Sequence, residues 1–138
     1  MNSGPVRRRE TFSRDDRLRK RREFEECYAS GVRVSGRHLL LFLLQRTAPS
    51  NAASSPARPR LGISVPRRVG GAVTRNRVRR RLREIFRRSR ELFGTRAGDV
   101  VVNARPSASD ATFEELGEEY RSLLAKSLVR AAEGRRSP

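Results

Sequence analysis

The chain has 138 residues, of which 32 are lysine or arginine and 15 are aspartate or glutamate, so its formal net charge is +17. This length favours one folded unit with a single modest core over two independent units. A compact protein tolerates so much positive charge best beside a polyanion that offsets the repulsion. The composition therefore favours nucleic acid as the partner.

The apolar segments are too short for a membrane-spanning protein. The longest run, Leu39 to Leu44, falls far below the ~20 residues that a bilayer-spanning helix needs. The basic N-terminal residues lead into no apolar segment typical of a secretory signal. Cys27 is the only cysteine and cannot form an internal disulfide, so we expect a cytoplasmic protein.

The basic residues are almost all arginine, with Lys20 and Lys126 as the two exceptions. A GC-rich genome would produce this bias, and so would a need for planar guanidinium groups that bind phosphates. Composition alone does not separate these explanations.

We expect one ordered domain over residues 20–131 with weakly packed ends. Residues 1–19 hold only isolated apolar side chains, which predicts a flexible basic arm. Residues 132–138 are expected to form a disordered tail. Residues 47–59 are small, polar and proline-rich, and they predict a flexible loop inside the domain.

Three segments have the apolar spacing of helices. The first covers residues 20–30, and the longest runs from Ala72 to Phe93. The last begins at Thr112, where Glu115 completes a capping box. The side chains that recur at this spacing are Phe24, Cys27 and Tyr28 in the first segment, Val78, Leu82, Ile85, Phe86, Ser89 and Phe93 in the second, and Phe113, Leu116, Tyr120, Leu123, Leu124 and Leu128 in the third.

The remaining ordered segments predict strands at residues 32–36, 38–46, 60–65 and 99–106. The leucine-rich run in the second segment could also form a helix, but its length favours a strand. The order is then helix, two or three strands, helix, strand, helix. This order predicts a single-domain α+β sandwich in which helices pack on one sheet.

Arginine is concentrated in the middle helix. Residues 75–90 contain nine arginines and one acid, Glu84, which we expect to pair with Arg80 and Arg88. A charged helical face is usually only solvated surface, but such faces normally mix acids with bases. At 100° per residue, one sector opposite the apolar stripe holds Asn76, Arg79, Arg80, Arg83, Arg87 and Arg90.

The segment before this helix favours anions as well. Arg67 and Arg68 precede Gly70 and Gly71 at the helix entrance, where free backbone N–H groups can bind phosphate. The helix face and its entrance together predict a surface that binds an RNA backbone through guanidinium groups.

The segment GISVPRRVGGAVTRNRVRRRLREIFR resembles the signature of the protein component of bacterial ribonuclease P, including its Arg75-Asn76-Arg77 triplet. The resemblance extends to REFEECYASGVRVSGRHLLLFLL upstream and DVVVNARP downstream, and it covers Leu18 to Arg130. It implies an α-β-β-β-α-β-α sandwich with a four-stranded sheet, like the second domain of ribosomal protein S5. The long loop, the arginine-rich arm and Pro66 depart from the family pattern.

In that family a large RNA uses Mg²⁺ to hydrolyse a phosphodiester bond and remove the 5′ leader of precursor tRNA, while the protein assists. The resemblance implies that this chain binds the catalytic RNA and precursor tRNA, with no cofactor of its own and no obligate protein partner. It places contacts to the catalytic RNA at Arg75, Asn76, Arg77, Arg79, Arg80, Arg83 and Arg87. It places a cleft for the single-stranded leader at Phe24, Tyr28, His38, Leu40, Phe42, Ser64 and Arg68.

The residues of this cleft also have a structural interpretation, because aromatic side chains at helical spacing usually pack inward. Strand alternation allows a core face and a cleft face on the same strand. Leu39, Leu41 and Leu43 share one face, and the residues between them share the other. Aromatic faces stack on bases of any sequence, which suits a variable leader.

The sequence offers no catalytic motif for the protein alone. His38 is the only histidine, and it lacks a partner at metal-ligand spacing. Phosphate loops, paired nuclease carboxylates and CxxC pairs are absent from the sequence. We therefore expect hydrolysis to belong to the RNA. A structural ribosomal or ribosome-assembly protein is the alternative, and DNA compaction would explain the charge but not the aromatic residues.

Overall fold

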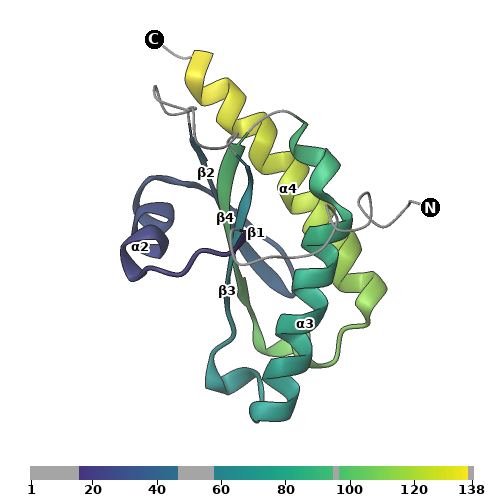
Figure 1. Cartoon of the computed structure of the whole chain (residues 1–138). Helices are drawn as coiled ribbons and strands as arrows, with labels where there is room; N and C mark the ends of the chain where they lie inside the picture. Colours follow the sequence, from purple (N-terminus) through teal and green to yellow (C-terminus); the bar gives the residue numbers. More distant parts are fainter. Residues whose placement is uncertain (1–15, 47–57, 95–96, 137–138) are drawn as a thin grey trace, which may run out of the picture.

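The computed structural model describes residues 16–46, 58–94 and 97–136 (Figure 1). Its helices and strands follow the predicted order, α-β-β-β-α-β-α, and confirm the α+β fold. They are α2 (Arg21–Ser30), β1 (Val32–Ser35), β2 (Leu39–Arg46), β3 (Arg60–Ser64), α3 (Ala72–Arg88), β4 (Ala97–Ala104) and α4 (Phe113–Arg136). Short 3₁₀ turns are η2 (Arg67–Val69), η3 (Arg90–Phe93) and η4 (Pro106–Ser109).

The four described strands form one sheet in the order β1-β2-β4-β3. β2 is antiparallel to both neighbours, whereas β3 and β4 are parallel because α3 connects them. Figure 1 shows three layers, with α2 on one face of the sheet and α3 and α4 side by side on the other. β4 is therefore a central strand with both faces available for packing.

The period-two alternation of β2 divides its side chains between the two faces as predicted. Leu39, Leu41 and Leu43 belong to the large core under α3 and α4. Phe42 belongs to a second, smaller cluster on the α2 side, together with Leu18, Cys27 and Val101. The sheet therefore separates the large core under α3 and α4 from the smaller cluster under α2.

α3 buries the predicted stripe of Val78, Leu82, Ile85 and Phe86, but it ends earlier than predicted. The α-helix stops at Arg88, and η3 continues to the predicted end at Phe93. The Ser89 N–H donates to Phe86 O, an i to i+3 bond that tightens the last turn. This tightening still buries Phe93, whose ring lies 6.2 Å from that of Phe86.

α4 begins with the predicted capping box. Glu115 N donates to Thr112 Oγ1 at 3.0 Å, and Thr112 N donates to Glu115 Oε1 at 2.9 Å. The helix continues to Arg136, so residues 132–136 are helical instead of belonging to a tail. The apolar stripe extends past Leu128 to Ala131, which packs against the core. Residues 137–138 of the predicted tail lie outside the described residues.

Residues before the predicted domain boundary at residue 20 take part in the fold. Leu18 N donates to Leu61 O at 2.9 Å, and Arg17 forms a parallel bridge to the same residue beside the edge strand β3. Leu18 is 5 % exposed, and the buried Asp16 binds Arg90. The Leu18 side chain, the Asp16 carboxylate and the backbone contacts to Leu61 together hold this segment, although the sequence around them is polar. Residues 1–15 of the predicted arm and 47–57 of the predicted loop lie outside the described residues.

No helix in the described part of the chain combines the length and apolar character needed to cross a bilayer.

Gly62 of β3 gives a first test of the packing under α2. A Cβ there would lie 2.8 Å from Phe24 Cε2 and Cζ and 3.1 Å from Leu18 Cδ1. We expect Gly62→Ala to lower the free energy of unfolding by about 1–3 kcal/mol, because the ring must move. Gly134→Ala on α4 is the matched control, since its Cβ meets nothing within 4 Å and alanine favours the helix. Urea unfolding measures both, and equal stabilities would contradict the close packing.

Candidate nucleic-acid interface

The outer side of α3 carries arginines whose guanidinium groups lack carboxylate partners among the described residues. We call Asn76, Arg79, Arg80 and Arg83 the α3 polar face. Asn76 and Arg80 are exposed, and Arg79 Nη1 donates to Asn76 Oδ1 at 2.9 Å. Spacings of three and four residues stack these side chains on successive turns, opposite the buried stripe. The predicted amphipathic arrangement is therefore present.

Electrostatic repulsion is concentrated at Arg83. Burial lowers the pKa of its guanidinium, and the charges of Arg17 and Arg79 lower it further. No carboxylate from the described part of the chain contributes to this shift. A phosphate bound at this point would relieve the repulsion between the three guanidinium groups.

Three other arginines of α3 bind backbone carbonyls of the protein. Arg75 Nε donates to Gly70 O at 3.1 Å, which closes the entrance turn of the helix. Arg77 Nη2 donates to Ser109 O at 3.2 Å, and Arg81 Nη1 donates to Ala111 O at 3.0 Å. These last two bonds attach α3 to the connection before α4. The predicted RNA contacts Arg75 and Arg77 are therefore also structural.

Glu84 pairs with Arg87 and Arg88, whereas the sequence led us to expect Arg80 and Arg88. Hydrogen bonding from Arg87 is the largest cause that lowers the pKa of Glu84 to about 2. The stabilisation from this pairing is present above the unfolded value of 4.5 and is lost as the pH falls toward 2. Arg87, a predicted RNA contact, is thus partly neutralised, and Arg80 stays on the α3 polar face.

The entrance of α3 is basic and uncapped by any side chain. Its N-cap is Gly71, which forms no side-chain cap hydrogen bond. Arg67 and Arg68 are both exposed in η2, directly before this turn. The structure thus places two exposed arginines beside the uncapped N-terminus of α3, and anion binding there stays a prediction.

A second surface lies on the opposite face of the sheet, where α2 ends. The Tyr28 and Phe42 rings pack edge to face with centroids 4.9 Å apart. Tyr28 is 41 % exposed, whereas Phe42 is 8 % exposed and serves mainly as its support. Phe24 lies deeper and packs against Gly62. Of the predicted aromatic wall, Tyr28 thus presents the accessible ring.

Beside this pair, a row of side chains crosses the sheet. Leu40 and Ser64, both predicted cleft residues, are each in register with Asn103 of β4. Tyr28 Oη donates to Asn103 Oδ1 at 3.1 Å, which connects α2 to this row. We call Tyr28, Leu40, Phe42, Ser64 and Asn103 the α2–sheet surface. Asn103 was not predicted from the sequence, although a lone amide in the run DVVVNARP was a usable signal.

His38 and Arg68 are less closely connected to this surface. His38 is 8 % exposed, and its Nδ1 lies 2.7 Å from Ser107 Oγ of η4. Its backbone N–H donates to Glu119 Oε2 at 2.8 Å. These contacts explain His38 as part of the β1–β2 connection. Arg68 is an exposed residue of η2 and belongs to the entrance of α3.

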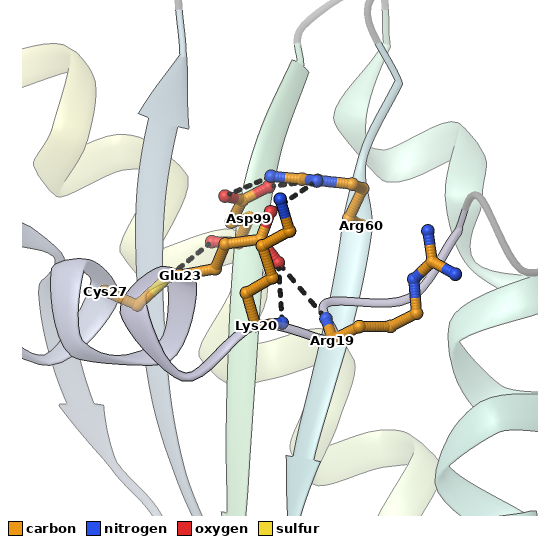
Figure 2. A network of polar contacts seen from close by, with 6 residues as sticks. All are labelled: Arg19, Lys20, Glu23, Cys27, Arg60 and Asp99. Carbon is orange, nitrogen blue, oxygen red and sulfur yellow. Dashed lines mark hydrogen bonds and ion pairs between the residues drawn. The ribbon is translucent and has the colours of Figure 1, made fainter.

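An ionic network attaches α2 to the sheet (Figure 2). Arg60 Nε and Nη2 donate to the two carboxylate oxygens of Asp99, each at 3.0 Å, and Nη1 donates to Glu23 Oε2 at 3.0 Å. Glu23 Oε1 accepts the backbone N–H groups of Arg19 and Lys20 at 3.1 Å each. One guanidinium therefore joins β3, β4 and the beginning of α2.

Burial changes the acidity of the groups in this network. It raises the pKa of the Asp99 carboxyl, and the Arg60 guanidinium only partly offsets the effect. Burial also raises the pKa of the Cys27 thiol, to about 12, and its Sγ lies 3.9 Å from Asp99 O. In Glu23 burial is outweighed by hydrogen bonds from Lys20 and Arg19, so its pKa is lowered. Glu23 is thus the firmly ionised partner of Arg60.

No group of three His, Cys, Asp or Glu side chains among the described residues could hold a metal ion.

Comparisons with known proteins agree on one family. A family model named Ribonuclease P matches residues 12–128. The ribonuclease P protein component of Desulfovibrio desulfuricans is 41 % identical over 107 residues, 78 % of this chain and 77 % of that protein. That of Acidothermus cellulolyticus is 38 % identical over 110 residues, 80 % of this chain and 86 % of that protein. The solved RNase P protein of Thermotoga maritima is 29 % identical, with a TM-score of 0.66 over 80 % of this chain and 96 % of its own.

Arg60→Met tests the ionic network. The substitution leaves Asp99, 3 % exposed, without its bidentate partner, so we expect the free energy of unfolding to fall by about 3 kcal/mol. The matched control is Arg21→Met, which removes an exposed pair with Glu25 and should cost about 0.5 kcal/mol or less. Thermal or urea unfolding measures both variants. Equal small losses would show that the network contributes little to the attachment of α2.

Proposed function

The chain belongs to the ribonuclease P protein family, and from this premise we propose how its two surfaces divide the work of the holoenzyme. As a member, it is a protein subunit of a ribonucleoprotein endoribonuclease that associates with the ribonuclease P RNA. We propose that the α3 polar face binds that RNA, while the α2–sheet surface binds the single-stranded 5′ leader of precursor tRNA. Hydrolysis and its Mg²⁺ belong to the RNA in this proposal.

The observation that supports the RNA contact is a set of arginines that have no carboxylate partner within residues 16–46, 58–94 and 97–136. Glu84 is the only acid within α3, and it is already shared by Arg87 and Arg88. Arg79, Arg80 and Arg83 therefore keep their charge for an outside anion. Planar guanidinium groups on successive turns suit phosphates along an RNA backbone. The remaining predicted contacts, Arg75, Arg77 and Arg87, support this face through their protein contacts and are secondary RNA contacts.

The leader contact rests on the different character of the second surface. Tyr28 offers an exposed ring on a rigid support, flanked by the partly exposed Leu40 and the polar Ser64. An aromatic platform of this kind stacks on an unpaired base without requiring a particular sequence. Duplex tRNA would not present such a base, whereas a single-stranded leader does. The surface therefore suits the part of the precursor that processing removes.

Arg79→Ala combined with Arg83→Ala tests the RNA contact. We expect weaker binding to the ribonuclease P RNA and a log K against log salt slope reduced by about 0.7–0.9 for each phosphate that the variant no longer neutralises. Arg121→Ala with Lys126→Ala removes the same charge from exposed positions of α4 and is the control. Filter binding across a salt series measures both. The same slope in the two double variants would overturn the assignment to the α3 polar face.

Tyr28→Ala tests the leader contact. Loss of one stacked base costs about 1–3 kcal/mol, so affinity for precursor tRNA should fall at least several-fold. Affinity for mature tRNA, which lacks the leader, should be unchanged. Binding of both tRNAs to the reconstituted holoenzyme measures the difference, with Val129→Ala on the exposed side of α4 as control. Equal losses on the two tRNAs would refute a leader site at the α2–sheet surface.

A further inference from the structure

α2 covers only part of the sheet face on which it lies. Its early residues lie over the rows that contain Arg60 and Asp99, and Phe24 packs against Gly62 in the next row. The following row, which includes Leu40, Asn103 and Ser64, lies toward the end of α2. All three of these residues are partly exposed. The third row is thus partly open to solvent beside the end of α2.

Asn103 is an unexpected residue at this position. β4 is a central strand, and its residues from Gly98 to Ala104 are buried apart from Asn103. Valines fill the neighbouring positions Val100 to Val102. β-branched side chains are the ones most often favoured on a strand, so packing alone does not explain an amide here. The amide oxygen binds the Tyr28 hydroxyl, and the partly exposed amide keeps two N–H donors with which it can bind a polar ligand.

The hydroxyl of Tyr28 determines how this amide is presented. Tyr28 Oη donates to Asn103 Oδ1 at 3.1 Å, so the oxygen end of the amide is held toward α2. The opposite end of the amide, Nδ2, carries two N–H donors. The group offered to a ligand is therefore an N–H donor, and its orientation is fixed by the residue that also supplies the stacking ring.

We propose that Asn103 is a specificity-determining residue that donates a hydrogen bond to the edge of the leader base stacked on Tyr28, and that the Tyr28 hydroxyl is its positioning group. This inference rests on the proposed leader site and adds a base preference to it. A free asparagine can pair as donor and acceptor at once. With Oδ1 engaged by Tyr28, Asn103 favours bases that present an acceptor at that position. A base that presents a donor there leaves the Nδ2 protons unpaired.

Three variants separate reading of the base from stacking on it. Tyr28→Phe keeps the ring and removes only the hydroxyl, while Asn103→Ala removes the amide. The double variant completes a cycle that detects action of one residue through the other. Val129→Ala on α4 is the control for general effects. The reconstituted holoenzyme is assayed for kcat/KM on precursor tRNAs in which each leader position carries each of the four bases in turn.

We expect the unaltered protein to prefer some bases at one leader position. Asn103→Ala should flatten that preference by roughly 3- to 10-fold, the effect of one hydrogen bond. Tyr28→Phe should flatten it at the same position, and the double variant should lose no more than Asn103→Ala alone. Affinity for mature tRNA and for the RNA subunit should stay unchanged in all three variants.

Other outcomes overturn the inference. A loss equal for all four bases would assign Asn103 to the leader backbone, and additive losses would show that the Tyr28 hydroxyl acts independently. An unaltered base profile in Asn103→Ala would remove its role altogether. Each of these results leaves the leader site itself intact, provided that Tyr28→Ala still weakens the binding of precursor tRNA without weakening that of mature tRNA. Failure of that second measurement would overturn the proposed function instead.

Discussion

The alternation of side chains along β2 and β4 is the constraint on which the rest of the molecule depends. Leu41 and Val102 face α3 and α4, while Phe42 and Val101 face α2. Because one sheet serves two packing layers, its central strands must be apolar on both sides. The larger layer fixes α3 firmly enough to present its arginines outward. The smaller layer is thin, so α2 needs the additional attachment that Arg60 provides through its two carboxylate partners.

Arginine has two roles in this fold, because some arginines bind backbone carbonyls of the protein and others remain on the α3 polar face. The sequence shows how many arginines there are but not which of them has which role. Arg77 and Arg81 bind the carbonyls of Ser109 and Ala111, which lie 32 and 30 residues further along the chain. Only the packing of α4 against α3 brings those carbonyls within reach. A helical wheel places the α3 polar face outward because its sector is opposite the buried stripe. The wheel cannot show that distant backbone oxygens bind Arg77 and Arg81, which lie between that sector and the buried stripe.

Most of the fold could be predicted because its elements carry local signals. The capping box at Thr112, the stripe of α3 and the alternation in β2 each depend on residues close in sequence. The misplaced boundary at residue 20 had a different cause, since Leu18 is ordered by Leu61, far along the chain. Asn103 was missed for the same reason. Its importance depends on a hydrogen bond from Tyr28, 75 residues earlier, and on the length of α2.

The two candidate surfaces lie on opposite sides of the sheet, one on α3 and the other beside α2 (Figure 1). An RNA bound to the α3 polar face therefore does not cover Tyr28, and both ligands can be held together. The two surfaces should also differ in how strongly salt weakens ligand binding. Contacts between guanidinium groups and phosphates weaken as counterions compete, whereas stacking on an aromatic ring depends on salt much less. Binding of the RNA subunit should thus supply most of the salt dependence, while the α2 side contributes discrimination between substrates.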